Sequence, residues 1–164
     1  MNYLKMFKKI KIKLLVDNNS SLEIEEDFFY NLSLVTLDKI SYPLEAAEIS
    51  LKLTDDEEMR KLNKKHRSLD KTTDVLSFPM NETKNIEENI LGDIVISVDT
   101  LRKQAKKYDM TINDELAFLY VHGLLHLLGY DHEISQTEEN NMFKLQNEIL
   151  LYNKYLTGGL SLGK

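Results

Sequence analysis

The chain has 164 residues, of which 42% are hydrophobic and 29% are charged, a composition typical of one soluble globular domain. It contains no cysteine, which excludes disulfides and cysteine-based metal sites and suits a reducing cytosol. No segment approaches the roughly 20 apolar residues of a membrane span, and the lysine-rich N-terminus has no uninterrupted apolar stretch of signal-peptide length. We therefore expect a cytoplasmic protein without a membrane partner.

The net charge of −6 taken alone argues against a nucleic-acid partner, but the basic residues are unevenly distributed. Five of the 21 lie in residues 5–13, six in 60–71 and four in 102–107, whereas acids outnumber bases by seven to three from residue 111 onward. An acidic molecule can still present a basic face to phosphate groups. For any single cluster, solvated lysines on a helix surface are the simpler interpretation.

The first part of the chain alternates strand and helix patterns. Apolar residues alternate with lysines over 8–16, as in a half-buried strand. A near-helical spacing follows over 25–41, and a second alternating segment over 47–53 predicts another strand. Thr54 then opens a capping-box pattern, so we expect a helix from there to about residue 65.

Two further strands and three helices are expected after residue 73. The strands are predicted over 74–80 and 90–98, and the helices over 99–108, 112–128 and from 135 onward. Gly92 suggests a bulge or a close backbone approach within its strand, and Asp99 is the expected cap of the first of these helices. Gly129 is a candidate for the left-handed position after the second helix, and Ser135 begins a capping box before the third.

The order of these elements predicts an α+β fold, in which one small mixed sheet is packed by helices and the helical half is C-terminal. No internal repeat is visible, so we expect a single domain over residues 1–156. Residues 157–164 are expected to form a mobile tail.

Three of the four histidines lie within the sequence HGLLHLLGYDH, at 122–132. His122 and His126 are four residues apart in the predicted helix and project from the same face. Gly129 allows the chain to reverse, so that His132 can approach them. Unrelated surface or core histidines are the usual interpretation of a lone residue, but this spacing favours a metal site. Three imidazoles with an open fourth position describe a catalytic zinc site, and other first-row metals such as nickel also suit them.

The spacing H-x-x-x-H-x-x-G-x-x-H is that of the metzincin proteases, but one essential residue differs. The residue after the first histidine, a glutamate that acts as general base in those enzymes, is here Gly123. This disfavours a peptidase. A bound metal can lower the pKa of water from 15.7 to about 7, so hydrolysis does not require that base.

A basic helix end offers a possible phosphate site. Arg67 can bind a phosphate through two hydrogen bonds, and Lys64 and Lys65 can contact an RNA backbone. A basic helix C-terminus also stabilises its own dipole, which is the simpler explanation. Asp74 is a possible general base or a hydrogen-bonding residue at a strand start, and Asp131 is a possible support for a metal ligand or a turn residue.

Three blocks of the sequence, HRSLDKTTDVLSFP, LGDIVIS and HGLLHLLGYDH, closely resemble the YbeY family of bacterial endoribonucleases. The resemblance spans residues 53–148 and implies a zincin-like three-histidine site formed by His122, His126 and His132. It also implies that Arg67 is important for activity. The implied function is metal-dependent hydrolysis of phosphodiester bonds in single-stranded ribosomal RNA, acting in ribosome biogenesis and maturation of the 16S 3′ end.

The resemblance further implies one Zn²⁺ per chain and a possible association with the small ribosomal subunit, and no DNA partner is expected. Two alternatives stay open. One is an RNA-binding ribosome-assembly factor with a structural metal, which a fourth protein ligand such as Asp131 would favour. The other is a metallohydrolase of another substrate class such as a peptide, which Gly123 disfavours.

Overall fold

The computed structural model describes residues 7, 9–25, 27–81, 88–131 and 133–158. Within these residues the elements are β1 Lys11–Asn18, α1 Phe28–Lys39, β2 Ala46–Thr54, α2 Asp56–Arg67, β3 Val75–Pro79, β4 Ile90–Ser97, α3 Val98–Lys107, α4 Ile112–Leu127 and α5 Gln136–Leu156. The strands form one sheet in the order β1-β2-β4-β3. β1, β2 and β4 are parallel, and β3 is antiparallel to β4. The predicted α+β fold with a small mixed sheet packed by helices is confirmed.

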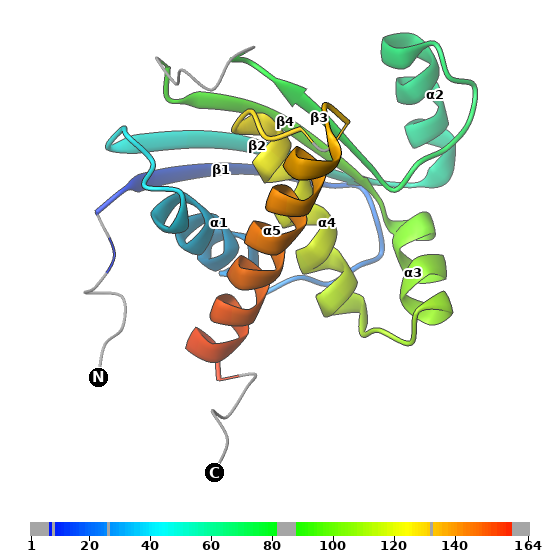
Figure 1. Cartoon of the computed structure of the whole chain (residues 1–164). Coiled ribbons are helices and arrows are strands. Elements are labelled where there is room, and N and C mark those ends of the chain that lie inside the picture. The colour runs from blue at the N-terminus through cyan, green and yellow to red at the C-terminus, as the bar shows by residue number, and fades with distance from the viewer. Residues whose placement is uncertain (1–6, 8, 26, 82–87, 132, 159–164) are drawn as a thin grey trace.

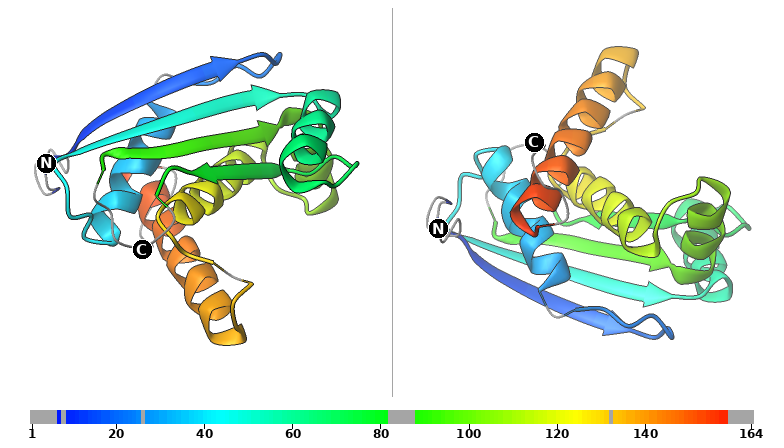
Figure 2. Two further views of the ribbon diagram at one scale, coloured as in Figure 1. Left: turned by 90° about the horizontal axis from the view of Figure 1, so that it is seen from above. Right: turned by 90° about the horizontal axis from the view of Figure 1, so that it is seen from below.

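The two faces of the sheet are covered differently. α1, α4 and α5 lie together on one side of the sheet, and α2 lies at one end of it (Figure 1). Figure 2 shows the same arrangement from above and below. On β2, Ile49, Leu51 and other alternate side chains are buried in the main core with those helices. A smaller core forms where Met59 of α2 packs with Leu76 and Val95, so α2 anchors to β3 and β4.

The starts of α2 and α3 differ from the sequence prediction. Thr54 is the last residue of β2, where it is paired with Ser97 of β4 and buried. The cap of α2 is instead Asp55, whose Oδ1 accepts a hydrogen bond from the Glu58 amide at 2.8 Å. Likewise Ser97, not Asp99, caps α3. β2 pairs with β4 through Thr54, which moves the cap of α2 to Asp55. β4 instead ends at Ser97, one residue earlier than predicted, so α3 begins at Val98.

Gly92 has both features that its position in a strand pattern suggested. The register of β2 against β4 shifts beside it, which marks a bulge. Its φ is +135°, and a Cβ atom there would lie 2.2 Å from the Phe78 carbonyl oxygen. The absence of a side chain therefore allows β3 to pair closely with β4 at this point.

The expected C-terminal tail, residues 157–164, follows the last helix. α5 ends at Leu156, and residues 159–164 of the expected tail lie outside the described residues. In the described part of the chain, no helix is both long and apolar enough to cross a membrane.

Candidate metal centre

α4 carries two of the three predicted metal ligands. It begins after Thr111, whose hydroxyl accepts the Asp114 amide hydrogen at 3.0 Å, and it ends before Gly129, which has a φ of +89°. One helical turn separates His122 from His126, and their Nε2 atoms lie 3.1 Å apart. Two ligands of one tetrahedral zinc, each about 2.05 Å from the metal, are separated by about 3.3 Å. The pair therefore fits a shared metal ion.

A buried glutamine fixes the ring of His122. Gln146 of α5 has an exposed fraction of 0%, and its Oε1 lies 3.0 Å from Nδ1 of His122. Its Nε2 donates to the Phe118 carbonyl at 3.1 Å, so Oε1 is the atom that faces the imidazole. Because that oxygen only accepts, Nδ1 carries the proton and the lone pair is on Nε2, the atom that lies 3.1 Å from Nε2 of His126. This tautomer is the one that a metal requires.

The third predicted ligand, His132, lies outside the described residues. The described residues alone contain no group of three or more histidine, cysteine or acidic side chains arranged to hold a metal. Oδ1 of Asp131, the residue before His132 in the sequence, accepts the Glu133 amide hydrogen at 2.8 Å. That oxygen therefore has the turn-forming role that was one of the two interpretations of Asp131.

The predicted arginine shares a cavity with His126, one of the predicted metal ligands. A cavity of about 550 Å³ is lined by Arg67, His126, Ser77 and Tyr130, among others. Arg67 is the last residue of α2 and is exposed, and within the described part of the chain its guanidinium makes no hydrogen bond or ion pair. The fold thus brings the guanidinium of Arg67, from α2, into the same cavity as the imidazole of His126, from α4.

The two predicted RNA-binding lysines lie outside this cavity. Lys64 Nζ is 3.5 Å from Asp70 Oδ2, and the other oxygen of Asp70 is 2.8 Å from Arg60 Nε. Lys65 is exposed in the last turn of α2. Both are exposed and lie within three residues of Arg67, which lines the cavity.

Gly123 faces the sheet and is tightly packed. A Cβ atom at this position would lie 2.9 Å from Ile94 Cγ2 and 3.2 Å from Ser77 Oγ. The Gly123 carbonyl also accepts a hydrogen bond from Ser77 Oγ at 3.1 Å. The position that carries the glutamate in metzincin proteases therefore has no room for a side chain here.

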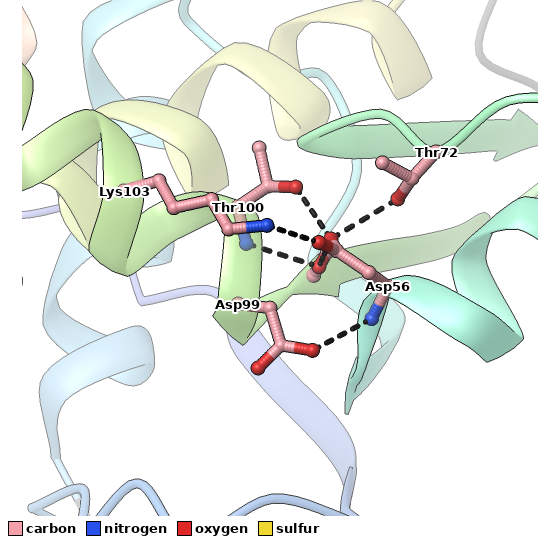
Figure 3. A network of polar contacts seen from close by, with 6 residues as sticks. Asp56, Thr72, Asp99, Thr100 and Lys103 are labelled. Carbon is pink, nitrogen blue, oxygen red and sulfur yellow. Dashed lines mark hydrogen bonds and ion pairs between the residues drawn. The ribbon is translucent and has the colours of Figure 1, made fainter.

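A polar network at the start of α2 holds the helix that carries Arg67. Oδ1 of Asp56 accepts hydrogen bonds from the hydroxyls of Thr72, Ser97 and Thr100, and Oδ2 pairs with Lys103 at 2.9 Å (Figure 3).

In return, the carboxylate of Asp99 accepts the Asp56 amide hydrogen at 3.0 Å. Burial acts to raise the pKa of Asp56. The three hydroxyls and the Lys103 ammonium that donate to its carboxylate outweigh burial and hold the pKa well below its usual range. The network joins the first turns of α2 and α3 to the loop before β3.

The sequence analysis did not identify Gln146. A sequence signal existed, because Met142, Gln146 and Ile149 follow one helical stripe and all three are buried. A glutamine in an apolar stripe requires a buried partner.

Comparisons with known proteins identify the family of the chain. A family model described as "Endoribonuclease YbeY" matches residues 9–154. The chain is 43% identical over 141 residues to the "Endoribonuclease YbeY" of Heliobacterium modesticaldum, covering 78% of this chain and 84% of that protein. It is 37% identical over 139 residues to that of Aliarcobacter butzleri, covering 80% of this chain and 99% of the relative.

A solved structure of a Thermotoga maritima protein, TM1509, shares the fold with a TM-score of 0.62 and 24% identity. The match covers 93% of this chain and 99% of that one. The family match and the curated relatives together establish that the chain belongs to the endoribonuclease YbeY family.

Proposed function

We propose that the protein is a metal-dependent endoribonuclease that hydrolyses phosphodiester bonds in single-stranded ribosomal RNA and acts in rRNA maturation. The observation that carries the proposal is the convergence of the His122 and His126 Nε2 atoms beside a cavity that Arg67 also lines. Membership of a family of endoribonucleases supports RNA as the substrate.

The three histidines would hold the metal, and zinc is the first choice for an all-imidazole site. When bound, such an ion supplies an activated water and a Lewis acid for the phosphoryl oxygens. Gln146 keeps the proton of His122 on Nδ1. Arg67 is placed to bind a phosphate oxygen in the cavity and to neutralise charge that develops there.

The surface around Arg67 suits an RNA backbone. The last turn of α2 carries the cations Lys64, Lys65 and Arg67, and such cations bind phosphates with little dependence on sequence. Lys64 and Lys65 would position the strand while Arg67 contacts the phosphate at the metal centre. An association with the small ribosomal subunit belongs to the same proposal.

The test is cleavage of a single-stranded rRNA fragment by the purified protein and by His126→Ala. The matched control is His66→Ala. His66 is the fourth histidine, and it lies on α2, whereas His126 lies on α4. Its ring packs on Phe78 with ring centroids 4.9 Å apart, and it does not line the cavity of His126. We expect cleavage by the parent and by His66→Ala, and none by His126→Ala.

Equal cleavage by all three proteins would contradict the proposed site. Binding without cleavage by the parent would favour an RNA-binding assembly factor with a structural metal. Circular dichroism of each variant establishes that the comparison is between folded proteins.

A further inference from the structure

A second and larger cavity lies away from the metal centre. Its volume is about 1110 Å³, and it is lined by the first turns of α4, the C-terminal half of α5 and residues next to the starts of α1 and β3. It shares no described lining residue with the cavity of Arg67 and His126. Cavities that bind small molecules are of this size or somewhat smaller.

A buried acidic side chain lines this cavity. Glu115, in the first turn of α4, has an exposed fraction of 4%, and its carboxylate makes no hydrogen bond or ion pair within the part of the chain that the structure describes. Burial, and next the charge of Asp74, raise the pKa of Glu115. Asp74 lines the same cavity, and its carboxylate accepts hydrogen bonds from the Val75 amide at 2.8 Å, the Thr73 hydroxyl at 3.3 Å and Nε2 of Gln104 at 3.3 Å. A buried carboxylate beside a second one is costly unless a cation or a proton compensates it.

The described residues around the cavity do not supply that cation. Of those that line it, Lys154 has the one basic side chain, and its Nζ pairs with Asp114 Oδ1 at 2.8 Å. Glu115 is thus a buried acceptor for which the described residues that line the cavity supply no donor.

The remaining walls are apolar and include Ala117, Phe118 and Leu150. The cavity is much larger than a bare metal ion, and no three acidic or imidazole groups among the described residues are arranged to hold one. An ammonium group brings three donors and a guanidinium five. Either group on an aliphatic stem would match both the acceptors and the apolar walls.

We propose that this cavity binds an organic cation, a primary ammonium or guanidinium on an aliphatic stem, with its charged end at Glu115 and Asp74. The stem lies along Phe118 and Leu150. The same chemistry is offered by a free polyamine and by a lysine or arginine side chain of a partner protein. The site does not depend on the proposed ribonuclease activity.

The test is a titration of the whole protein with spermidine and, separately, with N-acetyl-arginine amide, followed by calorimetry and by amide chemical shifts. Glu115→Gln removes the charge, and Glu45→Gln is the control, because it changes the net charge equally at an exposed residue outside the cavity. We expect saturable binding by the parent and by Glu45→Gln, with shifts near Phe118 and Leu150. We expect at least a tenfold weaker affinity in Glu115→Gln.

A second variant keeps the test decisive if Glu115→Gln does not fold. Leu151 lines the cavity but is 62% exposed, so Leu151→Arg leaves the core intact and places a guanidinium at the cavity mouth. It should weaken binding of both probes at least tenfold. A stronger affinity for spermidine identifies a free polyamine as the ligand type, and a stronger affinity for the arginine derivative identifies a protein side chain.

The proposal is overturned if the parent binds neither probe, or if the cavity variants bind as well as the parent does. Neither result bears on RNA cleavage, which is measured separately.

Discussion

Nδ1 of His122 lies 3.0 Å from Oε1 of Gln146, a glutamine of α5 that is completely buried. The contact joins the helix of the predicted metal ligands to the last helix of the chain. Because Gln146 Nε2 is bonded to the Phe118 carbonyl, the amide cannot turn over without losing two hydrogen bonds. The orientation of a predicted ligand is thus set from outside the histidine motif.

Replacement of Gln146 by leucine should therefore weaken metal binding. Loss of a partner of this kind typically lowers metal affinity about 10- to 100-fold, and we expect the same for zinc in Gln146→Leu, measured by competition with a chromophoric chelator. Gln146→Glu, which keeps an acceptor toward His122, should recover part of the affinity. Gln136→Leu, at the exposed start of α5, is the matched control. An unchanged zinc affinity in Gln146→Leu would show that the contact does not support the site.

Replacement of Arg67 by alanine should lower the cleavage rate without loss of metal. Removing one group that stabilises developing charge typically costs about 10²- to 10³-fold in rate. Single-turnover cleavage and metal content measured on the same samples separate the two effects. Arg102→Ala removes an exposed arginine from another helix and should cleave at the parental rate. Parental cleavage by Arg67→Ala would remove this residue from the proposed mechanism.

Asp56 should stabilise the fold through its charge. Its pKa in the folded protein is depressed, so its contribution is fully present above the unfolded-state pKa of about 3.9 and is lost as the pH falls toward the folded value. Asp56→Asn should lower the free energy of unfolding by roughly 1–3 kcal/mol at pH 7. This difference from the parent should shrink below about pH 4.

Urea denaturation at a series of pH values measures this dependence. Asp38→Asn, which removes a carboxylate outside the network, should match the parent throughout. A deficit of Asp56→Asn that stays constant down to pH 2 would contradict the electrostatic explanation.

Two glycines should tolerate alanine to different degrees. A Cβ atom at Gly92 would clash with the Phe78 carbonyl, and the φ of Gly92 is itself unfavourable for alanine. At Gly123 the closest atom is Ile94 Cγ2 of a side chain, at 2.9 Å. Gly123→Ala should cost about 1–3 kcal/mol, as other overpacked sites do, and Gly92→Ala more. Thermal unfolding gives the order, and a smaller loss for Gly92→Ala would contradict it.

The features that were predictable from the sequence rest on local signals. The shared face of His122 and His126 follows from helical periodicity. The hydroxyl of Ser135 caps its helix as expected, because the hydrogen bond lies within one turn. Gly129 has the expected left-handed conformation. The approach of Arg67 to His126 required the family resemblance, because no local pattern relates α2 to α4.

The features that were missed depend on contacts distant in sequence. Whether Thr54 or Asp55 caps α2 is decided by how far β2 pairs with β4. The antiparallel direction of β3 and the partner of Gln146 likewise arise from packing between elements. Such roles are not encoded in the immediate neighbours of a residue.

The most direct test of the central claim is the cleavage rate of metal-stripped protein as zinc is added back in steps. The proposal predicts no cleavage of the rRNA fragment before addition, a rise that saturates at about one zinc per chain, and a flat response in His126→Ala. Cleavage by the stripped parent at the full rate, or an equal response to zinc in His126→Ala, would contradict a metal-dependent ribonuclease centred on His122 and His126.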